Sequence, residues 1–155
     1  MKTSIKAFLL VFVAAITFHS CSDNSMEKQA QHYLQEAKKH ADKGEFDQAL
    51  ANIDSLRKNC RQDIKAREAA LKLYQSTELK RAQQTVQQVD AKLQQINSEY
   101  NKMSGTVSSL KKQGIATAQQ LEAFTKMRIL RDSLQTAFDT ECAKVRFIKQ
   151  KMSEQ

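Results

Sequence analysis

The sequence contains no proline and no tryptophan, and only three of its 155 residues are glycine. A β-sandwich or β-barrel needs a turn every ~8–12 residues, and turns depend on glycine and proline, so these folds are excluded. The glycines, Gly44, Gly105 and Gly114, are also too scattered to form the phosphate-binding loop of a doubly wound α/β protein. Good helix formers dominate instead, namely Ala, Glu, Lys, Arg, Gln and Leu. The composition predicts an all-α protein with long helices.

Residues that perform chemistry are also few. After residue 20, histidine occurs only at His32 and His40, and the sequence has no HExxH, GxSxG or paired-cysteine metal motif. Glu36 lies between the two histidines, so a His-Glu-His metal stripe on one helix face is an alternative to three solvated side chains. Acidic residues are scattered along the predicted helices. We therefore expect no enzyme activity, no catalytic, cofactor-binding or metal-binding residues and no small-molecule substrate.

The first twenty residues differ in composition from the rest. Lys2 and Lys6 precede the apolar run AFLLVFVAAITF at residues 7–18. A basic start followed by an apolar stretch of this length is typical of a secretory signal peptide. Twelve residues span about 18 Å as a helix, well short of the ~30 Å hydrocarbon core of a bilayer, so a permanent membrane-spanning helix is not expected.

The apolar run ends in Phe18-His19-Ser20-Cys21, followed by the polar residues 22–25. A small residue directly before a single cysteine at this place resembles the lipobox of bacterial lipoproteins, in a relaxed form because Phe18 and His19 replace the usual residues. The resemblance implies cleavage before Cys21, lipidation of the Cys21 sulfur, and residues 21–26 as a lipidated tether. Ser22 rather than Asp follows the cysteine, which in the best-studied lipoproteins favours the outer membrane. The alternative is ordinary secretion, with Cys21 unmodified.

The charge balance bears on the partner. The chain has 25 basic and 17 acidic residues, and removal of Lys2 and Lys6 with the signal leaves 23 − 17 = +6. A basic balance is typical of nucleic-acid binding, but export argues against it and the bases are interspersed with acids. Solvated surface is the simplest interpretation. Attraction to anionic lipid headgroups or to an acidic partner is the alternative.

Residues 27–60 predict a helical hairpin, with a first helix over residues 27–43 and a break at Gly44. Ala37, Gly44, Phe46 and Ala49 resemble the small and aromatic positions of one tetratricopeptide repeat. The resemblance departs from the family at Glu36, His40 and Arg61. One repeat cannot bury its apolar face alone, so the hairpin should dock on the rest of the chain or on a partner. A peptide-binding groove is the alternative, and exposed Tyr33, Ala37, Phe46 and Ile53 would favour it.

Residues 61–155 predict a long antiparallel coiled-coil hairpin with a turn near 113–117. The seam of its first helix repeats every three and four residues. It comprises Leu79, Ala82, Val86, Val89, Leu93, Ile96, Tyr100, Met103, Val107 and Leu110. Ile64, Leu71 and Tyr74 extend this stripe upstream. Gly105 is a potential break, Gly114 fits a helix C-cap, and Thr117 with Gln120 fits a capping box at the start of the last helix.

The last helix is predicted from about residue 118 to 152. Its stripe comprises Leu121, Phe124, Met127, Leu130, Leu134, Phe138, Cys142, Val145, Ile148 and Met152. The short turn favours pairing within one chain. A parallel homodimer through residues 79–110 is the alternative.

Cys60 and Cys142 are expected to be free thiols. With the turn near Gly114, Cys142 lies opposite about residue 87, some 40 Å along the axis from Cys60, too far for a disulfide. An intermolecular disulfide through Cys60 stays open.

Taken together, the sequence predicts a non-enzymatic lipoprotein of the bacterial cell envelope, anchored to a membrane through Cys21. Its helices would act as a scaffold or adaptor for other envelope proteins. The glutamines at 83, 84, 87, 88, 94 and 95 would form a polar face. The alternative is a periplasmic holdase-type chaperone, since basic coiled-coil arms resemble that family.

Overall fold

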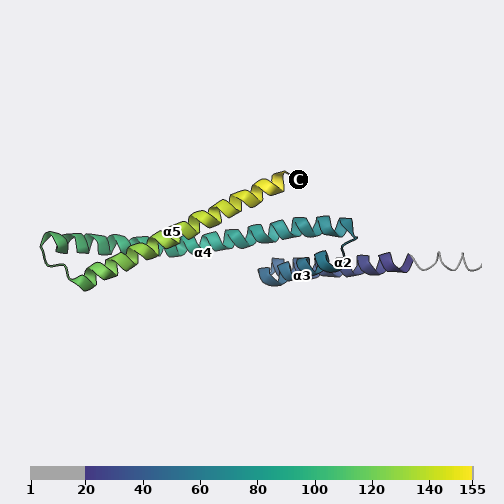
Figure 1. Ribbon diagram of the computed structural model, residues 1–155, viewed down its shortest axis with the longest axis horizontal. Helices are drawn as coiled ribbons and strands as arrows, with labels where there is room; N and C mark the ends of the chain where they lie inside the picture. Colours follow the sequence, from purple (N-terminus) through teal and green to yellow (C-terminus); the bar gives the residue numbers. More distant parts are fainter. Residues whose placement is uncertain (1–19, 155) are drawn as a thin grey trace, which may run out of the picture. The chain divides into compact units, whose positions relative to one another are not determined.

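The structure, a computed structural model, describes residues 20–154 and the side chains of residues 25–154. Within this range the chain forms four helices and no strand: α2 (Ser20–Asp42), α3 (Phe46–Asn59), α4 (Ile64–Lys112) and α5 (Ala118–Ser153) (Figure 1). The all-α prediction is confirmed. The expected signal peptide lies, except for Ser20, outside the described residues. Because α2 begins at Ser20 rather than near residue 27, the expected tether at 21–26 is helical.

The chain divides into two compact units, and the boundary falls inside α4 between Thr77 and Glu78. In the first unit, α2 and α3 form an antiparallel hairpin (Figure 1). Side chains of the first three turns of α4 join the core of this hairpin. The core comprises Ala30, Ala37, Ile53, Leu56, Cys60, Ala66 and Ala70. The small alanines allow the helix backbones to approach closely, and partly buried Met26, Tyr33, Leu34, Leu50 and Leu73 pack around them.

Two of the three connections between the helices contain a glycine that ends the preceding helix. Gly44 has φ +78°, and the backbone N–H groups of Gly44 and Glu45 donate to the carbonyls of Ala41 and His40. Gly114 has φ +73°, with the same pair of hydrogen bonds one helix later. This is the Schellman C-cap, in which a left-handed residue ends the helix and satisfies its last carbonyl groups. The predicted role of Gly114 is confirmed.

Polar caps set the starts of α4 and α5. The Asp63 carboxylate accepts the backbone N–H of Ala66 at 2.9 Å, which explains why α4 begins at Ile64 rather than at residue 61. At α5 the Thr117 hydroxyl accepts from the Gln120 N–H and the Gln120 side chain accepts from the Thr117 N–H. The predicted capping box is confirmed.

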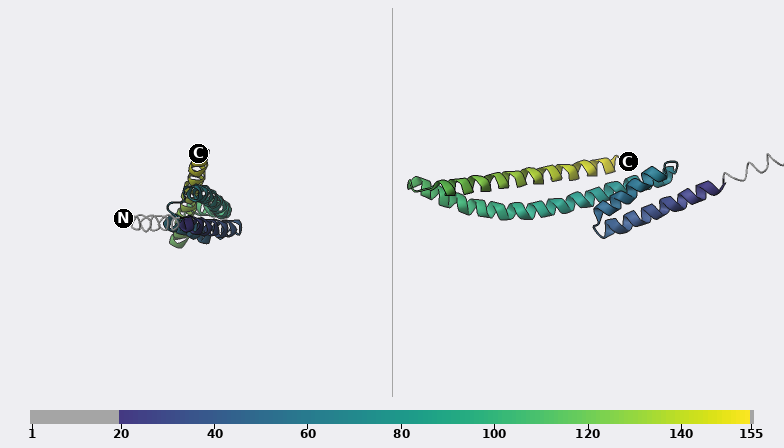
Figure 2. Two further views of the ribbon diagram at one scale, coloured as in Figure 1. Left: turned by 90° about the vertical axis from the view of Figure 1, so that its right-hand side faces the viewer. Right: turned by 60° about the horizontal axis from the view of Figure 1, so that its bottom comes forward.

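In the second unit, the part of α4 from Glu78 onward and α5 run antiparallel and are joined by residues 113–117 (Figure 2). Contacts at two levels fix their register. Lys144 Nζ lies 3.1 Å from Glu78 Oε2, and the rings of Tyr100 and Phe124 stack. Gly105 does not break α4, which continues to Lys112.

The α4 seam is better buried than the α5 seam. Ala82, Leu93 and Val107 are buried, whereas α5 has no buried residue. Leu130, expected in the α5 stripe, is 46% exposed, and Arg131 takes its place facing α4, with its guanidinium carbon 4.0 Å from the Tyr100 ring centroid. Met152, the last predicted stripe residue, is also exposed.

Candidate functional site

The one site residue that the sequence predicts, Cys21, lies in the first turn of α2. Its backbone is helical, and its side chain is outside the described part of the chain. The preceding residues 1–19, which carry the signal-peptide prediction, are likewise not described. The lipidation of Cys21 therefore stays a prediction.

The most prominent surface feature of the first unit is an apolar patch formed by Ile64, Leu71 and Tyr74 on α4. These side chains are 70%, 46% and 37% exposed. Spacings of seven and three residues place them on one face over about 15 Å of helix. The patch borders a cavity of about 350 Å³ lined by Arg57, Ile64, Arg67, Glu68, Ala70, Leu71 and Tyr74.

The patch is exposed because the other side of the same helix supplies the core. Ala66 and Ala70 are buried among residues of α2 and α3, and Leu73 packs against them. Spacings of four and three residues put these three on one stripe, which turns Ile64 and Leu71 outward. From size and spacing, these larger side chains were predicted to extend the apolar seam of the coiled coil. The sequence signal for this arrangement is the stripe formed by Ala66, Ala70 and Leu73. It was missed because alanine is a common helix former at buried and exposed positions alike.

Charged groups surround the patch. Arg57 on α3 and Arg67 and Glu68 on α4 line the same cavity. Arg57 Nη1 lies 4.0 Å from Asp54 Oδ1, and both side chains are more than half exposed, so this pair contributes little to stability. An apolar floor with arginines at its edge is an arrangement typical of protein–protein contact sites.

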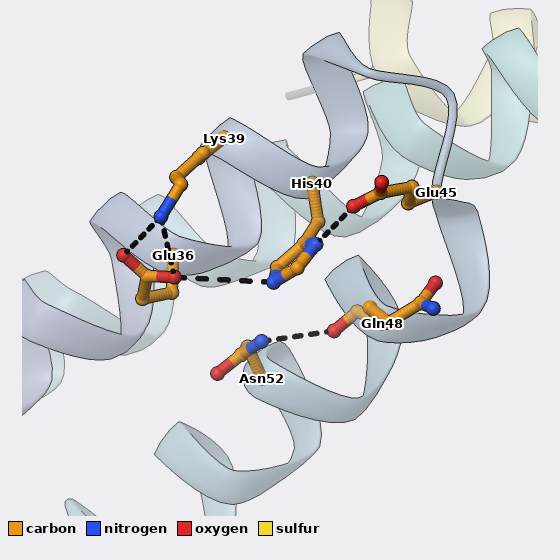
Figure 3. Close-up of polar contacts among 6 residues, drawn as sticks. All are labelled: Glu36, Lys39, His40, Glu45, Gln48 and Asn52. Atoms are coloured by element: carbon orange, nitrogen blue, oxygen red, sulfur yellow. Dashed lines mark hydrogen bonds and ion pairs between the residues drawn. The ribbon is translucent and has the colours of Figure 1, made fainter.

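A second polar cluster lies at the turn between α2 and α3 (Figure 3). His40 Nδ1 is 2.5 Å from Glu45 Oε2, and His40 Nε2 is 3.9 Å from Glu36 Oε2. The hydrogen bond from His40 lowers the pKa of Glu45, because it favours the charged carboxylate. Glu45 precedes α3 as its N-cap but makes no side-chain capping bond, so its carboxylate ties the start of α3 to the end of α2 instead.

The His-Glu-His metal stripe does not form a ligand cluster. His32 lies against the Tyr33 ring, while His40 turns toward Glu45. Within the described range, no three His, Cys, Asp or Glu side chains come together as a metal site.

The second unit carries a groove between α4 and α5 of about 630 Å³. It is lined by Gln83, Val86, Gln87, Phe138, Asp139, Cys142, Val145 and Arg146. Cys142 thus lies across from Val86 and Gln87, as the turn near Gly114 predicts. The six glutamines of the predicted polar face of α4 are all exposed.

Cys60 and Cys142 are free thiols, as predicted, but their surroundings differ. Cys60 is fully buried in the first unit, and burial raises the pKa of its thiol. Cys142 is only partly buried.

A peptide-binding groove on the hairpin would be favoured by exposure of four apolar residues. Two of them, Ala37 and Ile53, are instead buried in the same core as Cys60.

Comparison with known protein families, curated proteins and solved structures found no significant match. In the part of the chain that the structure describes, no helix combines the length and the apolar character needed to cross a membrane.

Proposed function

We propose that the protein is a non-enzymatic lipoprotein of the bacterial cell envelope that acts as a helical adaptor for other envelope proteins. In this account the chain is cleaved before Cys21, acylated there, and held on the membrane by its lipid. The first unit then offers the apolar patch to a partner, and the coiled-coil hairpin gives the protein reach.

Two features of the sequence support the anchor. The basic start and twelve-residue apolar run fit a signal peptide, and the run ends in a small residue followed by Cys21. Two or three acyl chains hold a protein stably on a membrane, whereas one chain gives only marginal binding. Ser22 after the cysteine favours the outer membrane. The tetratricopeptide-like pattern of residues 30–60 is consistent with an interaction module, since hairpins of this type serve as protein-binding repeats.

The single observation that carries the adaptor role is the exposure of the apolar patch. Three large apolar side chains share one face of α4 beside a cavity. Exposed patches of this kind mark interaction sites in soluble proteins. Burial of the patch by a partner would remove this apolar surface from water and supply much of the binding energy.

Site-specific crosslinking in the native host tests this role. A photo-crosslinking amino acid replaces Leu71 in the patch or, as the matched control, Gln88 on the exposed polar face of the same helix. We expect a discrete adduct with an envelope protein from position 71 and none from position 88. The adduct should disappear when Ile64→Ser and Tyr74→Ser are added. Equal adducts from both positions, or none from position 71, would contradict the adaptor role.

A holdase-type chaperone is the second candidate, favoured by the half-open groove between α4 and α5. Val86, Phe138 and Val145 present apolar surface there, and the expected mature chain is basic at +6. A holdase would suppress aggregation of an unfolded outer-membrane protein in a light-scattering assay. Phe138→Ser would weaken that suppression and Leu71→Ser would leave it unchanged, which separates the two candidates.

A further inference from the structure

The end of α5 carries an outward-facing aromatic ring between two lysines. Phe147 is 60% exposed, while Val145, two residues earlier, lines the groove toward α4. Lys144 and Lys151 lie one turn before and one turn after Phe147 on the same face of the helix. Lys151 Nζ is 5.9 Å from the centroid of the Phe147 ring. Phe147 is thus a large apolar side chain that is exposed to solvent and flanked by two lysines.

The surrounding segment is basic. Residues 142–153 contain four cationic side chains, Lys144, Arg146, Lys149 and Lys151, and no acidic one. Two carboxylates offset part of this charge, since Glu78 pairs with Lys144 and Glu154 with Lys151. Two positive charges remain in excess. The negative end of the helix dipole accounts for a lysine in the last turn of α5, but it does not account for the exposure of Phe147.

We propose that the end of α5, residues 142–153, binds the surface of an anionic lipid bilayer. Lys144 and Lys151, which share the face of Phe147, would approach the lipid phosphates, and the Phe147 ring would enter the boundary between headgroups and acyl chains. Helices that lie on membranes combine basic residues with exposed aromatic or leucine side chains in this way. Phe147 stands on the outer side of its helix, and a bilayer accepts such a side chain without a shaped pocket.

This surface goes beyond the adaptor role and does not require lipidation of Cys21. Where Cys21 is acylated, the α5 surface adds a second membrane contact. Each additional lysine or arginine near an anionic surface strengthens binding by about fivefold, and salt weakens the attraction.

The same helix contains a matched control. Ile129 is 58% exposed and lies 18 residues before Phe147, which is five whole turns and therefore the same face. Its segment of equal length, residues 122–133, has three cations and two acids, a net charge of 3 − 2 = +1 against +4 for residues 142–153. Lys126 and Arg131 in this segment pair with Glu122 and Asp132. Exposure and position are matched, and the charge differs.

Because the chain has no tryptophan, a single one reports on its own site. Phe147→Trp and Ile129→Trp are made in the full chain and purified from the envelope in whatever processed form the host produces. Each is mixed or reconstituted with vesicles of phosphatidylcholine alone, or of phosphatidylcholine with about 30% phosphatidylglycerol. Fluorescence emission and quenching by brominated lipid are recorded, and the intact mass of each sample is measured separately.

We expect a blue shift and bromolipid quenching for Phe147→Trp in the phosphatidylglycerol vesicles, reversed by high salt, and neither signal for Ile129→Trp. Adding Lys144→Gln and Lys151→Gln to Phe147→Trp should lower the lipid affinity by about 25-fold while the helical circular dichroism stays unchanged. No shift at position 147, or the same shift at 129, would overturn the proposal. Because the reporters sit on α5, this result is independent of the mass at Cys21 and of the crosslinks at Leu71.

Discussion

The ring of Phe124 on α5 stacks on the ring of Tyr100 on α4, with centroids 5.2 Å apart and planes inclined by 19°. The Arg131 guanidinium lies over the same Tyr100 ring at 4.0 Å. In a two-helix hairpin, where much of the seam remains partly exposed, such a three-part contact helps to hold the helices together. It also fixes the register of the two helices.

Replacing Phe124 should therefore destabilise the hairpin. Phe124→Ala removes a half-buried ring and its stacking contact with Tyr100, and we expect it to lower the free energy of unfolding by about 2 kcal/mol. Urea denaturation followed by circular dichroism measures this loss. Ile129→Ala on the exposed face is the control and should change the free energy by less than about 0.5 kcal/mol. Equal effects of the two substitutions would be inconsistent with the stacked register.

Alanine at two glycines should act with opposite sign. Gly114 has φ +73°, a conformation that costs an alanine about 1–2 kcal/mol, so Gly114→Ala should destabilise the protein by about this amount. Gly105 lies inside α4, and a Cβ there meets nothing within 4 Å. Gly105→Ala should stabilise by about 0.5–1 kcal/mol because alanine favours a helix interior. Thermal and urea unfolding of the two variants give the comparison, and a stabilising Gly114→Ala would argue against the turn at 113–117.

The hydrogen bond between His40 and Glu45 predicts a pH dependence. The pKa of Glu45 lies below its ordinary value of 4.5 in the folded protein, mainly because His40 hydrogen-bonds to the carboxylate. Its contribution to stability is thus present above pH 4.5 and is lost as the pH falls through the folded-state pKa. The melting temperature should fall less steeply below pH 4.5 in Glu45→Gln than in the natural protein. In a His40→Gln background, Glu45→Gln should have a smaller effect on that slope, since only the attraction of Lys43 and Lys39 still lowers the pKa of Glu45, and an undiminished effect would refute the assignment.

The two thiols should react at different rates. Cys60 has no exposed surface and burial raises its pKa, whereas Cys142 lies at a groove open to solvent. We expect iodoacetamide to label Cys142 in the native protein about a hundredfold faster than Cys60, which reacts only after local opening. Peptide mass spectrometry of timed samples measures the ratio, and labelling in urea should remove it. Fast native labelling of Cys60 would show that the three-helix core of the first unit is not closed.

The sequence was sufficient to predict the long helices and the turns because their signals are local. A helix is indicated by the spacing of seam residues such as Leu93 and Val107. Its start is indicated by the capping residues Thr117 and Gln120, and its end by Gly114. Each of these signals depends only on residues close by in the sequence. The start of α2 was not predicted, since the polar residues before Met26 carry no apolar periodicity.

The apolar patch depends on packing between distant segments, which a local pattern does not contain. Ile64 and Leu71 looked like core residues because they are large, yet the alanines at 66 and 70 fit the narrow space against α2 and α3. Size alone therefore pointed to the wrong face of α4. Arg131 was missed for a related reason: its place over Tyr100 requires the register of α5 against α4, which the heptad pattern of a single helix does not fix.

The most direct test of the account is the intact mass of the protein extracted from the membranes of its native host. We expect a chain that begins at Cys21 and carries two or three acyl chains. A chain cut near residue 20 without lipid would contradict the anchor and favour the chaperone. An uncleaved chain that still contains Lys2 and Lys6 would contradict both functions.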